Sequence, residues 1–389
     1  MVVHSYYPLD ETRVQRQAEA LVAGGVEVDV ICLRHGDEPR VDSAAGVTVH
    51  RLPLRRNKKG GPPAQFLEYL AFLSLAFFKL TGLHLRQRYH VVQVHNLPDF
   101  LVFAALIPWL TGSRVILDLH DLMPEFYCAK FNTTLESWPV RFVRWQEQLS
   151  CRFAHYVITV SEHWRQALIR RGVPAYKCGV VMNVADESIF RWSVDARPRS
   201  SEVPDFRLIY HGTLPQRYGL DLAIQAIDQV RYDIPNIHLT ILGQGESVDT
   251  LMQMIRERNL EHHVTLYNEI RPPEKLPELI RTADVGIVPY RNDLFTDSLL
   301  PTKLMEYAAL GLPAIAARTT AIEAYFKNTM AEFFEPGDVS DLVRCIRFLY
   351  HSPERLAELA EGSRKFNERY NWTRIGADYV ALVERLHRQ

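Results

Sequence analysis

The chain has 389 residues, more than the ~250–300 at which single hydrophobic cores stop growing, so we expect two domains. Its 45 Lys and Arg balance 46 Asp and Glu, which excludes the strong basic charge of a typical nucleic-acid-binding protein. A hydrophobic share of 47% with 11% aromatic residues excludes a disordered chain.

Cysteine usage and the first residues indicate the compartment. The five cysteines are scattered and never form a CxxC pair, which predicts a reducing environment and no metal site. The N-terminus lacks the basic and apolar pattern of a signal peptide. We therefore expect a cytoplasmic protein.

In the first half, short apolar runs alternate with helical patterns, which predicts parallel βαβ units. Strands are expected at 1–4, 26–33, 47–52, 91–96, 114–121, 155–161 and 179–182, with helices at about 12–23, 66–85, 100–110 and 139–153. We interpret this half as one doubly wound domain.

The segment 51–85 joins a basic loop to the most apolar helix of the chain. The loop carries Arg51, Arg55, Arg56, Lys58 and Lys59. Glu68 and Lys79 leave too short an uncharged core in the helix for a membrane span, which needs ~20 residues. The pattern is typical of a helix lying on an anionic membrane surface, although a helix packed on its own sheet behind a solvated loop would look the same.

The polar, proline-bearing stretch 191–205 is predicted to be a linker, after which a second set of strands begins. These strands are expected at 207–212, 238–243, 264–268, 284–290 and 313–317. Ligands of open α/β sheets bind beyond the carboxyl ends of the strands, so the residues that follow each strand are the candidates for a binding site.

The most informative segment is 296–316, in which a polar loop leads into a helix and then a strand. Pro301 suits the first turn of the helix and Gly311 its end, while Lys303 and Glu306 share one helical face. The positive end of the helix could hold a phosphate together with three loop amides, those of Ser298, Leu299 and Leu300. The Glu306 carboxylate could accept hydrogen bonds from sugar hydroxyls. The alternative is a surface helix whose Lys and Glu only pair with each other.

Further candidates follow other strands of the second half. After the strand at 207–212, Gly212 allows close approach of a ligand and Arg217 offers a cation for a diphosphate. Gly243 and Gly245 form a second glycine turn.

Two strands of the first half end in histidines. His95 lies at the end of the strand at 91–96 and Asp99 follows it, and His120 and Asp121 end the strand at 114–121. One such histidine is usually structural. Two at neighbouring strand ends favour a functional role, because histidine binds hydroxyls and moves protons.

These segments together resemble the retaining nucleotide-sugar glycosyltransferases of family 4 (glycosyltransferase group 1), which have the GT-B fold. In chain order the similar segments are ETRVQRQAEALVAGGVEVDVI, VQVHNLPDF, ILDLHDLMPEF, TVSEHW, VVMNVADESIF, YHGTLPQRYGLD, ILGQGE, TADVGIVPY and PTKLMEYAALGLPAIA. The resemblance implies two facing Rossmann-like, doubly wound parallel-sheet domains with a C-terminal crossover helix. The acceptor-binding domain would comprise 1–190 plus 372–389, and the nucleotide-sugar-binding domain 206–371.

The resemblance also implies roles for individual residues of the second domain. Glu306 matches the second glutamate of the family's Glu-x7-Glu signature, whereas Ser298 replaces the first. The diphosphate-binding Arg and Lys of the family's GRLxxxKG pattern correspond to Thr213 and Tyr218, with Arg217 displaced by one position. Arg217 and Lys303 are therefore assigned to the diphosphate charge. The donor-binding group is then Gly212, Thr213, Gly243, Gly245, Ser298, Leu299 and Leu300.

In the first domain, His120 matches the family's histidine beside the reacting sugar, and Arg13 lies where the donor phosphates approach. The acceptor would contact His95, Asp99 and Asp121. The resemblance thus implies that His120, Glu306, Arg217 and Lys303 carry catalysis without a metal or cofactor, the substrate being a UDP- or GDP-sugar.

The expected function is sugar transfer with retention to a hydroxyl acceptor, in surface polysaccharide or lipid-linked glycan assembly at the inner face of the cytoplasmic membrane. The expected partners are the nucleotide-sugar, a glycan or lipid-linked acceptor and an anionic membrane surface, but not nucleic acid. A sugar-nucleotide 2-epimerase has the same architecture and remains an alternative. A non-catalytic partner subunit is a second one, because half of the glutamate signature is missing.

Overall fold

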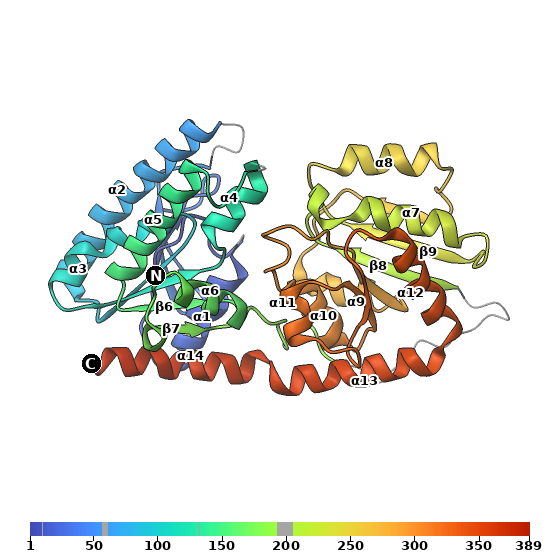
Figure 1. Cartoon of the computed structure of the whole chain (residues 1–389). Coiled ribbons are helices and arrows are strands. Elements are labelled where there is room, and N and C mark those ends of the chain that lie inside the picture. The colour runs from blue at the N-terminus through green and yellow to red at the C-terminus, as the bar shows by residue number, and fades with distance from the viewer. Residues whose placement is uncertain (10, 57–60, 132, 193–204) are drawn as a thin grey trace. The chain divides into compact units, whose positions relative to one another are not determined.

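The structure, a computed structural model, describes residues 1–9, 11–56, 61–131, 133–192 and 205–389. The chain forms two compact units, unit 1 with Met1–Asn183 and Thr373–Gln389, and unit 2 with Val184–Trp372. Each unit combines helices with a largely parallel sheet (Figure 1), which confirms the predicted α/β class. The boundary between the units lies before the predicted linker, of which 193–204 fall outside the described residues.

The sheet of unit 1 has two parts joined by the N-terminal residues. Its strands are β1 (Asp29–Leu33), β2 (Val41–Ala44), β3 (Val47–Leu52), β4 (Val91–His95), β5 (Arg114–Leu119), β6 (Tyr156–Thr159) and β7 (Cys178–Val180). The order is β2-β3-β1 in one part and β4-β5-β6-β7 in the other. Val2 forms one parallel bridge to Ile31 and one to Val94, so the predicted first strand is present only as a single bridging residue between β1 and β4.

Strand β2 is the one antiparallel strand of this sheet in the part of the chain that the structure describes, and it was not predicted. Three of its four residues are exposed, so it lacks the apolar pattern that marks the other strands.

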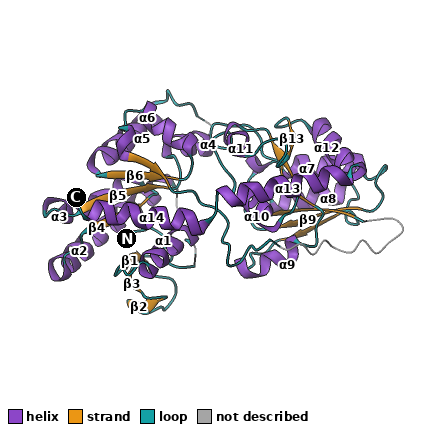
Figure 2. Ribbon diagram, turned by 90° about the horizontal axis from the view of Figure 1, so that it is seen from below, coloured by secondary structure: helices purple, strands orange, loops and turns teal. Residues whose placement is uncertain are grey.

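Helices surround the unit 1 sheet (Figure 2). They are α1 (Thr12–Ala23), α2 (Pro62–Gln87), α3 (Leu106–Leu110), α4 (Met123–Phe131), α5 (Trp138–Phe153), α6 (Glu162–Arg170) and α14 (Trp372–His387), with 3-10 turns η1 (Asp99–Ala105) and η2 (Ala175–Lys177). The C-terminal helix α14 is tied to this sheet because the Tyr379 hydroxyl donates a 2.6 Å hydrogen bond to Gln93 Oε1 on β4.

Helix α2 is long and apolar enough to cross a membrane by length and composition alone. One of its faces nevertheless packs into unit 1, with Phe72, Ala76 and Leu80 buried at helical spacing. Glu68 is buried as well, 3.0 Å from His4 Nε2. These contacts make α2 a core helix on one side.

The expected basic loop before α2 is only partly a basic surface. Arg51 is buried and pairs with Glu38 at 3.1 Å and Asp42 at 3.4 Å, which contradicts its predicted membrane contact. Arg55 is exposed and Arg56 half-buried, while Lys58 and Lys59 lie outside the described residues.

Unit 2 contains a six-stranded sheet whose pairings are all parallel in the described part of the chain. Its strands are β8 (Phe206–His211), β9 (Ile237–Leu242), β10 (Val264–Tyr267), β11 (Val285–Val288), β12 (Ala314–Ala317) and β13 (Glu332–Phe334). Its helices are α7 (Leu220–Val230), α8 (Val248–Glu257), α9 (Leu276–Ile280), α10 (Thr302–Leu310), α11 (Thr320–Tyr325), α12 (Val339–His351) and α13 (Pro353–Arg369), with 3-10 turns η3 (Gln216–Tyr218) and η4 (Pro273–Lys275).

The strand order of unit 2 is β10-β9-β8-β11-β12-β13. From β8 the chain proceeds outward to β9 and β10 and then returns to the other side of β8 with β11. The carboxyl ends of β8 and β11 thus flank the point at which the winding reverses, where open α/β sheets bind ligands. Helix α10, with Lys303 and Glu306, begins in the segment that follows β11.

Candidate active site

The predicted site residues fall into two groups, one in each unit. In unit 2, the loops after β8 and β9 pack backbone against backbone. The Gly212 N–H donates to the Leu242 carbonyl at 2.9 Å, and a Cβ at Gly243 would lie 1.7 Å from the Gly212 oxygen. A Cβ at Gly245 would lie 2.6 Å from the Leu214 oxygen. The two glycines of this turn are therefore required by loop packing itself, independently of any ligand.

Lys303 occupies a cage of three tyrosines at the carboxyl ends of the neighbouring strands β8 and β11. Its side chain is 6% exposed, and Nζ donates a 2.7 Å hydrogen bond to the Tyr290 hydroxyl. The rings of Tyr210, Tyr218 and Tyr290 lie 4.9, 5.0 and 5.1 Å from Nζ, distances at which an aromatic face attracts a cation. The Cε of Lys303 also lies against Gly212, 3.3 Å from where a Cβ would be. The buried ammonium thus adjoins the exposed glycine loop.

The electrostatics of this cage are unusual for a lysine. Burial lowers the pKa of Lys303 to about 8, although the nearby Glu306 carboxylate opposes that shift. Burial and the Lys303 charge together lower the pKa of His211 to about 3, so His211 is neutral at neutral pH. Its Nε2 lies 3.2 Å from a Glu306 oxygen. Because Lys303 is buried among rings and Glu306 faces a neutral imidazole, the two residues are not the solvated surface pair of the alternative interpretation.

The loop before α10 differs from its prediction. The Ser298 N–H donates to the Phe295 carbonyl at 3.2 Å and the Leu299 N–H to that of Thr296 at 3.3 Å, so both amides are used inside the loop. Ser298 and Leu300 are themselves buried. The prediction that these amides hold a phosphate is therefore wrong for Ser298 and Leu299, whose N–H groups already donate to carbonyls of the same loop. Helix α10 starts after Pro301 without a side-chain cap, and its own first amides retain the partial positive charge of a helix N-terminus.

Arg217 belongs to turn η3, which also supplies Tyr218 to the cage. Its backbone carbonyl accepts a 3.0 Å hydrogen bond from the Arg291 N–H, and its guanidinium lies 5.7 Å from the Phe295 ring centroid. The side chain is half-buried, and Thr213 in the same loop is exposed. Turn η3 is thereby connected both to the segment after β11 and to the loop before α10.

In unit 1, Arg13 is part of a buried ion pair. Its Nε lies 3.1 Å from Asp118 Oδ2 and its Nη2 2.9 Å from Oδ1, while Nη1 donates to the Val181 carbonyl at 2.6 Å. Although burial alone would raise it, the guanidinium holds the pKa of Asp118 well below its usual range. Arg13 is 5% exposed, so the predicted contact with donor phosphates is replaced by a structural role.

The two predicted histidines meet directly. His95 Nδ1 lies 3.0 Å from His120 Nε2, and the Asn96 side chain accepts a 2.7 Å hydrogen bond from the His120 N–H. His95 is fully buried, which lowers its pKa to about 4 although Asp118 opposes the shift. The side chain of His120 is 17% exposed. Of the two, His120 is therefore the one that a substrate can reach, and His95 positions it.

The two predicted acceptor aspartates differ in accessibility. Asp99 is fully buried and accepts a 2.9 Å hydrogen bond from Asn96. Burial, followed by the charge of Glu147, raises the pKa of Asp99 to about 8. His95 and Asp99 are thus too deep for the predicted acceptor contact, which corrects both. Asp121 is half-buried, and burial raises its pKa to about 6 although the neighbouring His120 opposes the shift.

One group of potential metal ligands occurs in the described ranges, formed by His95, Asp118 and His120 with ligand atoms within 4.8 Å of one another. Asp118 already accepts hydrogen bonds from Arg13 and from Gln17, the latter at 3.0 Å. A metal ion at this position would lie beside a guanidinium of the same sign. The residues therefore fit a metal poorly.

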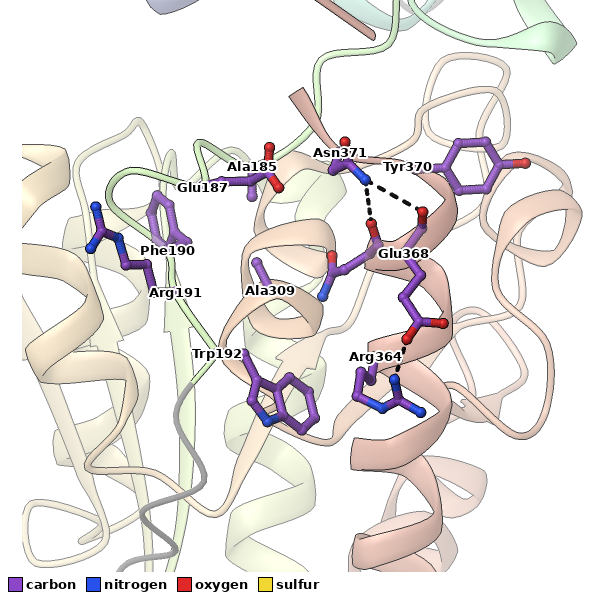
Figure 3. Close-up of a pocket in the computed structure, with 11 residues that line it drawn as sticks. Ala185, Glu187, Phe190, Arg191, Trp192, Ala309, Arg364, Glu368, Tyr370 and Asn371 are labelled. Atoms are coloured by element: carbon purple, nitrogen blue, oxygen red, sulfur yellow. Dashed lines mark hydrogen bonds and ion pairs between the residues drawn. The ribbon is translucent and has the colours of Figure 1, made fainter. Parts of the chain in front are cut away.

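A cavity of about 390 Å³ lies elsewhere in unit 2 (Figure 3). Its wall includes Trp192, Arg364, Glu368 and Tyr370, and it reaches Ala309 near the end of α10. None of the predicted donor residues lines it, so it is a separate feature from the tyrosine cage.

Tyr210, Tyr290 and His211 were not identified from the sequence, and Tyr218 was named only as the position of the family's lysine. Tyr210 and His211 end β8, and Tyr290 follows β11. Their position at or just after the ends of buried strands was the available signal, but tyrosine is so common in strands that this position alone does not mark a site.

The chain is similar in sequence and in fold to known proteins. A glycosyltransferase from Erwinia amylovora that acts in amylovoran biosynthesis, AmsK, is 24% identical over 237 residues, which cover 59% of this chain and 56% of AmsK. The match therefore spans little more than half the length of that relative.

Two solved structures have the same fold. Sucrose-phosphate synthase from Thermosynechococcus elongatus matches with a TM-score of 0.76 at 19% identity, covering 96% of this chain and 92% of that one. Anabaena HepE, solved in complex with UDP, matches with a TM-score of 0.70 at 16% identity and 98% coverage of both chains. These likenesses confirm the predicted pair of Rossmann-like domains.

Family models match both halves of the chain in succession. Residues 11–183 match the glycosyl transferase 4-like domain, and residues 195–366 match the glycosyl transferases group 1 domain. The order of these two domains is the one implied by the motifs of the sequence. This chain therefore belongs to the group 1 glycosyltransferases of family 4, with the GT-B fold.

Proposed function

We propose that this chain transfers a sugar from a nucleoside-diphosphate sugar, bound by unit 2, to a hydroxyl acceptor. The observation that carries the proposal is the buried Lys303 ammonium, which lies beside the glycine loop at the carboxyl ends of β8 and β11. A lysine in such a cage loses much of its hydration, and a bound diphosphate would offset that loss with negative charge. The names of the relatives support it, because AmsK is a biosynthetic glycosyltransferase and HepE was solved with UDP.

In the proposed reaction, the bond between the anomeric carbon and the diphosphate oxygen breaks, and negative charge develops on the leaving phosphate. Lys303, Arg217 and the N-terminal amides of α10 would stabilise that charge without a metal, and preorganised donors of this kind contribute about 3 kcal/mol each. The acceptor hydroxyl would attack from the face of departure and give its proton to a phosphate oxygen, with retention. His120 would polarise the reacting groups rather than act as a nucleophile.

A screen of nucleotides tests the donor assignment. UDP or GDP is expected to raise the Tm of the full chain by several degrees at saturating concentration, because a ligand that binds only the folded state stabilises it. UMP and GMP, which lack the second phosphate, are the matched controls and are expected to shift the Tm much less. The absence of a response to either diphosphate would contradict the proposal.

The diphosphate that raises the Tm identifies the class of nucleotide-sugar to test. Turnover of such a nucleotide-sugar without an acceptor would instead indicate an epimerase. Nucleotide binding without any turnover, across a panel of lipid-linked and glycan acceptors, would indicate a partner subunit.

The role of His120 is tested by His120→Ala. We expect a fall in kcat of about 10²-fold or more, in the range typical of a positioned polar or acid–base group, with unchanged nucleotide binding in unit 2. His90→Ala is the control, because His90 is an exposed histidine of the same unit. Equal kcat values for His120→Ala and wild type would remove His120 from the mechanism.

We further propose that the acceptor is a lipid-linked or surface glycan and that the protein works at the inner face of the cytoplasmic membrane. The exposed apolar side of α2 supports this location, with Leu67, Phe78 and Leu85 each at least 65% exposed. A glycan extended while attached to lipid would keep its reacting hydroxyl close to such a surface. Equal kcat/KM for a lipid-linked acceptor and its delipidated glycan would contradict a membrane-bound acceptor.

A further inference from the structure

Helix α5 presents aromatic side chains to solvent along one face. Trp138, Phe142, Trp145 and Leu149 recur at helical spacing and are 79%, 54%, 56% and 39% exposed. We call these four residues the aromatic face of α5. Large apolar side chains contiguous on one exposed face indicate an interaction site rather than ordinary surface.

The opposite side of α5 is anchored in unit 1 by packing and by an ion pair. Val140 and Cys151 are buried there, and Glu147 lies 2.9 Å from the Arg171 guanidinium with only 1% of its side chain exposed. The helix thus directs its one carboxylate inward and its indole rings outward. This orientation excludes the interpretation that the aromatic face is a core face exposed by helix rotation.

The charges that helices α2, α3 and α5 themselves present to solvent are all basic, and the loop before α5 exposes one carboxylate, that of Glu136. Helices α2, α3 and α5 contain two carboxylates, those of Glu68 and Glu147, and both are buried in pairs with His4 and Arg171. Their exposed or half-exposed charges are basic, namely those of Lys79, Arg86, Arg141, Arg144 and Arg152. Arg141 and Arg152 lie within one turn of the ends of the aromatic face. Apolar rings interleaved with arginines complement an anionic, partly apolar partner.

The helices next to α5 expose apolar residues as well. Turn η1 and helix α3 pack between α2 and α5, with Trp109 stacked on Phe153 and Phe66 against Phe100. In Figure 1, α2, α3 and α5 share one side of unit 1. Leu110 of α3 and Leu67 of α2 are exposed there as well. The surface is therefore broader than a single helix.

We propose that the aromatic face of α5 inserts into the interface of an anionic lipid bilayer, with the exposed side of α2 next to it. Indole rings favour the boundary between lipid headgroups and acyl chains, and arginines beside them attract anionic headgroups. The proposal adds a docking element that the segment 51–85 does not contain, and it does not depend on which sugar is transferred.

Vesicle co-sedimentation of the full chain tests the proposal. Wild type is expected to bind vesicles of phosphatidylcholine with 30% phosphatidylglycerol, and to bind pure phosphatidylcholine at least tenfold more weakly. The double variant Phe142→Gln/Trp145→Gln is expected to lose at least tenfold in vesicle affinity. Arg141→Gln/Arg152→Gln is expected to lose a similar factor at low salt and to show a weaker dependence on salt than wild type.

Tyr232→Gln is the matched control, because Tyr232 is a 75% exposed aromatic residue of unit 2, and it is expected to bind vesicles as wild type does. The α5 variants change exposed side chains, so their Tm and nucleotide binding are expected to stay unchanged. Unaltered nucleotide binding separates failure of this proposal from failure of the proposed sugar transfer.

Three results would overturn the proposal. Wild type could fail to bind the anionic vesicles at low salt, or Phe142→Gln/Trp145→Gln could bind them with wild-type affinity. A lipid-free dimer that becomes monomeric in the same variant would assign the aromatic face to a second copy of the chain instead.

Discussion

Lys303→Met is expected to weaken UDP or GDP binding by about 10- to 100-fold, the effect of losing a charge-assisted hydrogen bond of about 1.5–3 kcal/mol. Methionine fills a similar volume inside the cage of Tyr210, Tyr218 and Tyr290 but brings no charge. Isothermal titration of wild type and variant with the diphosphate that binds in the screen measures the difference. Wild-type affinity in Lys303→Met would place the diphosphate elsewhere.

The same variant is expected to raise the Tm, which distinguishes lost binding from lost folding. Burial lowers the pKa of Lys303 from 10.5 to about 8, which corresponds to a folding cost on the order of 3 kcal/mol for the charged form. That cost is fully present below pH 8 and disappears as the pH rises towards the unfolded value of 10.5. Methionine removes it, so the gain in Tm is expected at pH 7 and not near pH 10.

The lowered pKa of Lys303 also predicts how nucleotide affinity depends on pH. A bound diphosphate favours the protonated amine, so above pH 8, where free Lys303 loses its proton, binding must take up a proton. Affinity is therefore expected to be constant between pH 7 and pH 8 and to fall by up to about tenfold per pH unit above pH 8. Lys303→Arg keeps its charge throughout this range and is the control, with no such fall. A flat wild-type profile from pH 7 to 10 would contradict the assignment.

Glu306→Gln is expected to lower kcat by about 10²- to 10³-fold, in the range found when one preorganised electrostatic group of an active site is removed. The carboxylate lies 3.2 Å from His211, which is neutral, and we assign it to the sugar hydroxyls and to positive charge on the sugar ring. Glutamine keeps the shape and loses that charge. Initial rates with the nucleotide-sugar and acceptor give kcat.

Binding of the free diphosphate distinguishes the role of Lys303 from that of Glu306, the two site residues of α10. Glu306→Gln is expected to bind UDP or GDP as wild type does, because Glu306 is assigned to the sugar, whereas Lys303→Met is expected to bind it weakly. Glu323→Gln on α11 is the control for kcat, since Glu323 is paired with Arg318 near the surface. A wild-type rate for Glu306→Gln would show that the sugar binds away from α10.

Local patterns predicted most of the secondary structure. Helix α1 lies at Thr12–Ala23 as expected, and β3 at Val47–Leu52, because apolar spacing and glycine stops are properties of neighbouring residues. The exposed β2 and the three-residue β13 were missed, since neither is long and apolar enough to show a period.

The assignment of individual site residues was less complete, because sequence positions do not show direction or depth. Arg13 follows the first strand as expected, but its guanidinium points inward to Asp118, far away along the chain. His95 and His120 were both candidates, and only burial separates the inner histidine from the reachable one. The Ser298 and Leu299 amides were expected to face a ligand, yet they close turns of their own loop.

By itself, the sequence determined most of the strands and helices and the two-domain α/β class, and it singled out the Lys303 and Glu306 helix as a candidate site, because periodicity and short motifs depend on residues close in the chain. Only the folded chain brought Tyr210, Tyr218 and Tyr290 around Lys303, since they come from β8, η3 and the segment after β11. The charge state of that lysine depends on its distance from water, which is a property of three-dimensional packing and is not encoded in any local pattern.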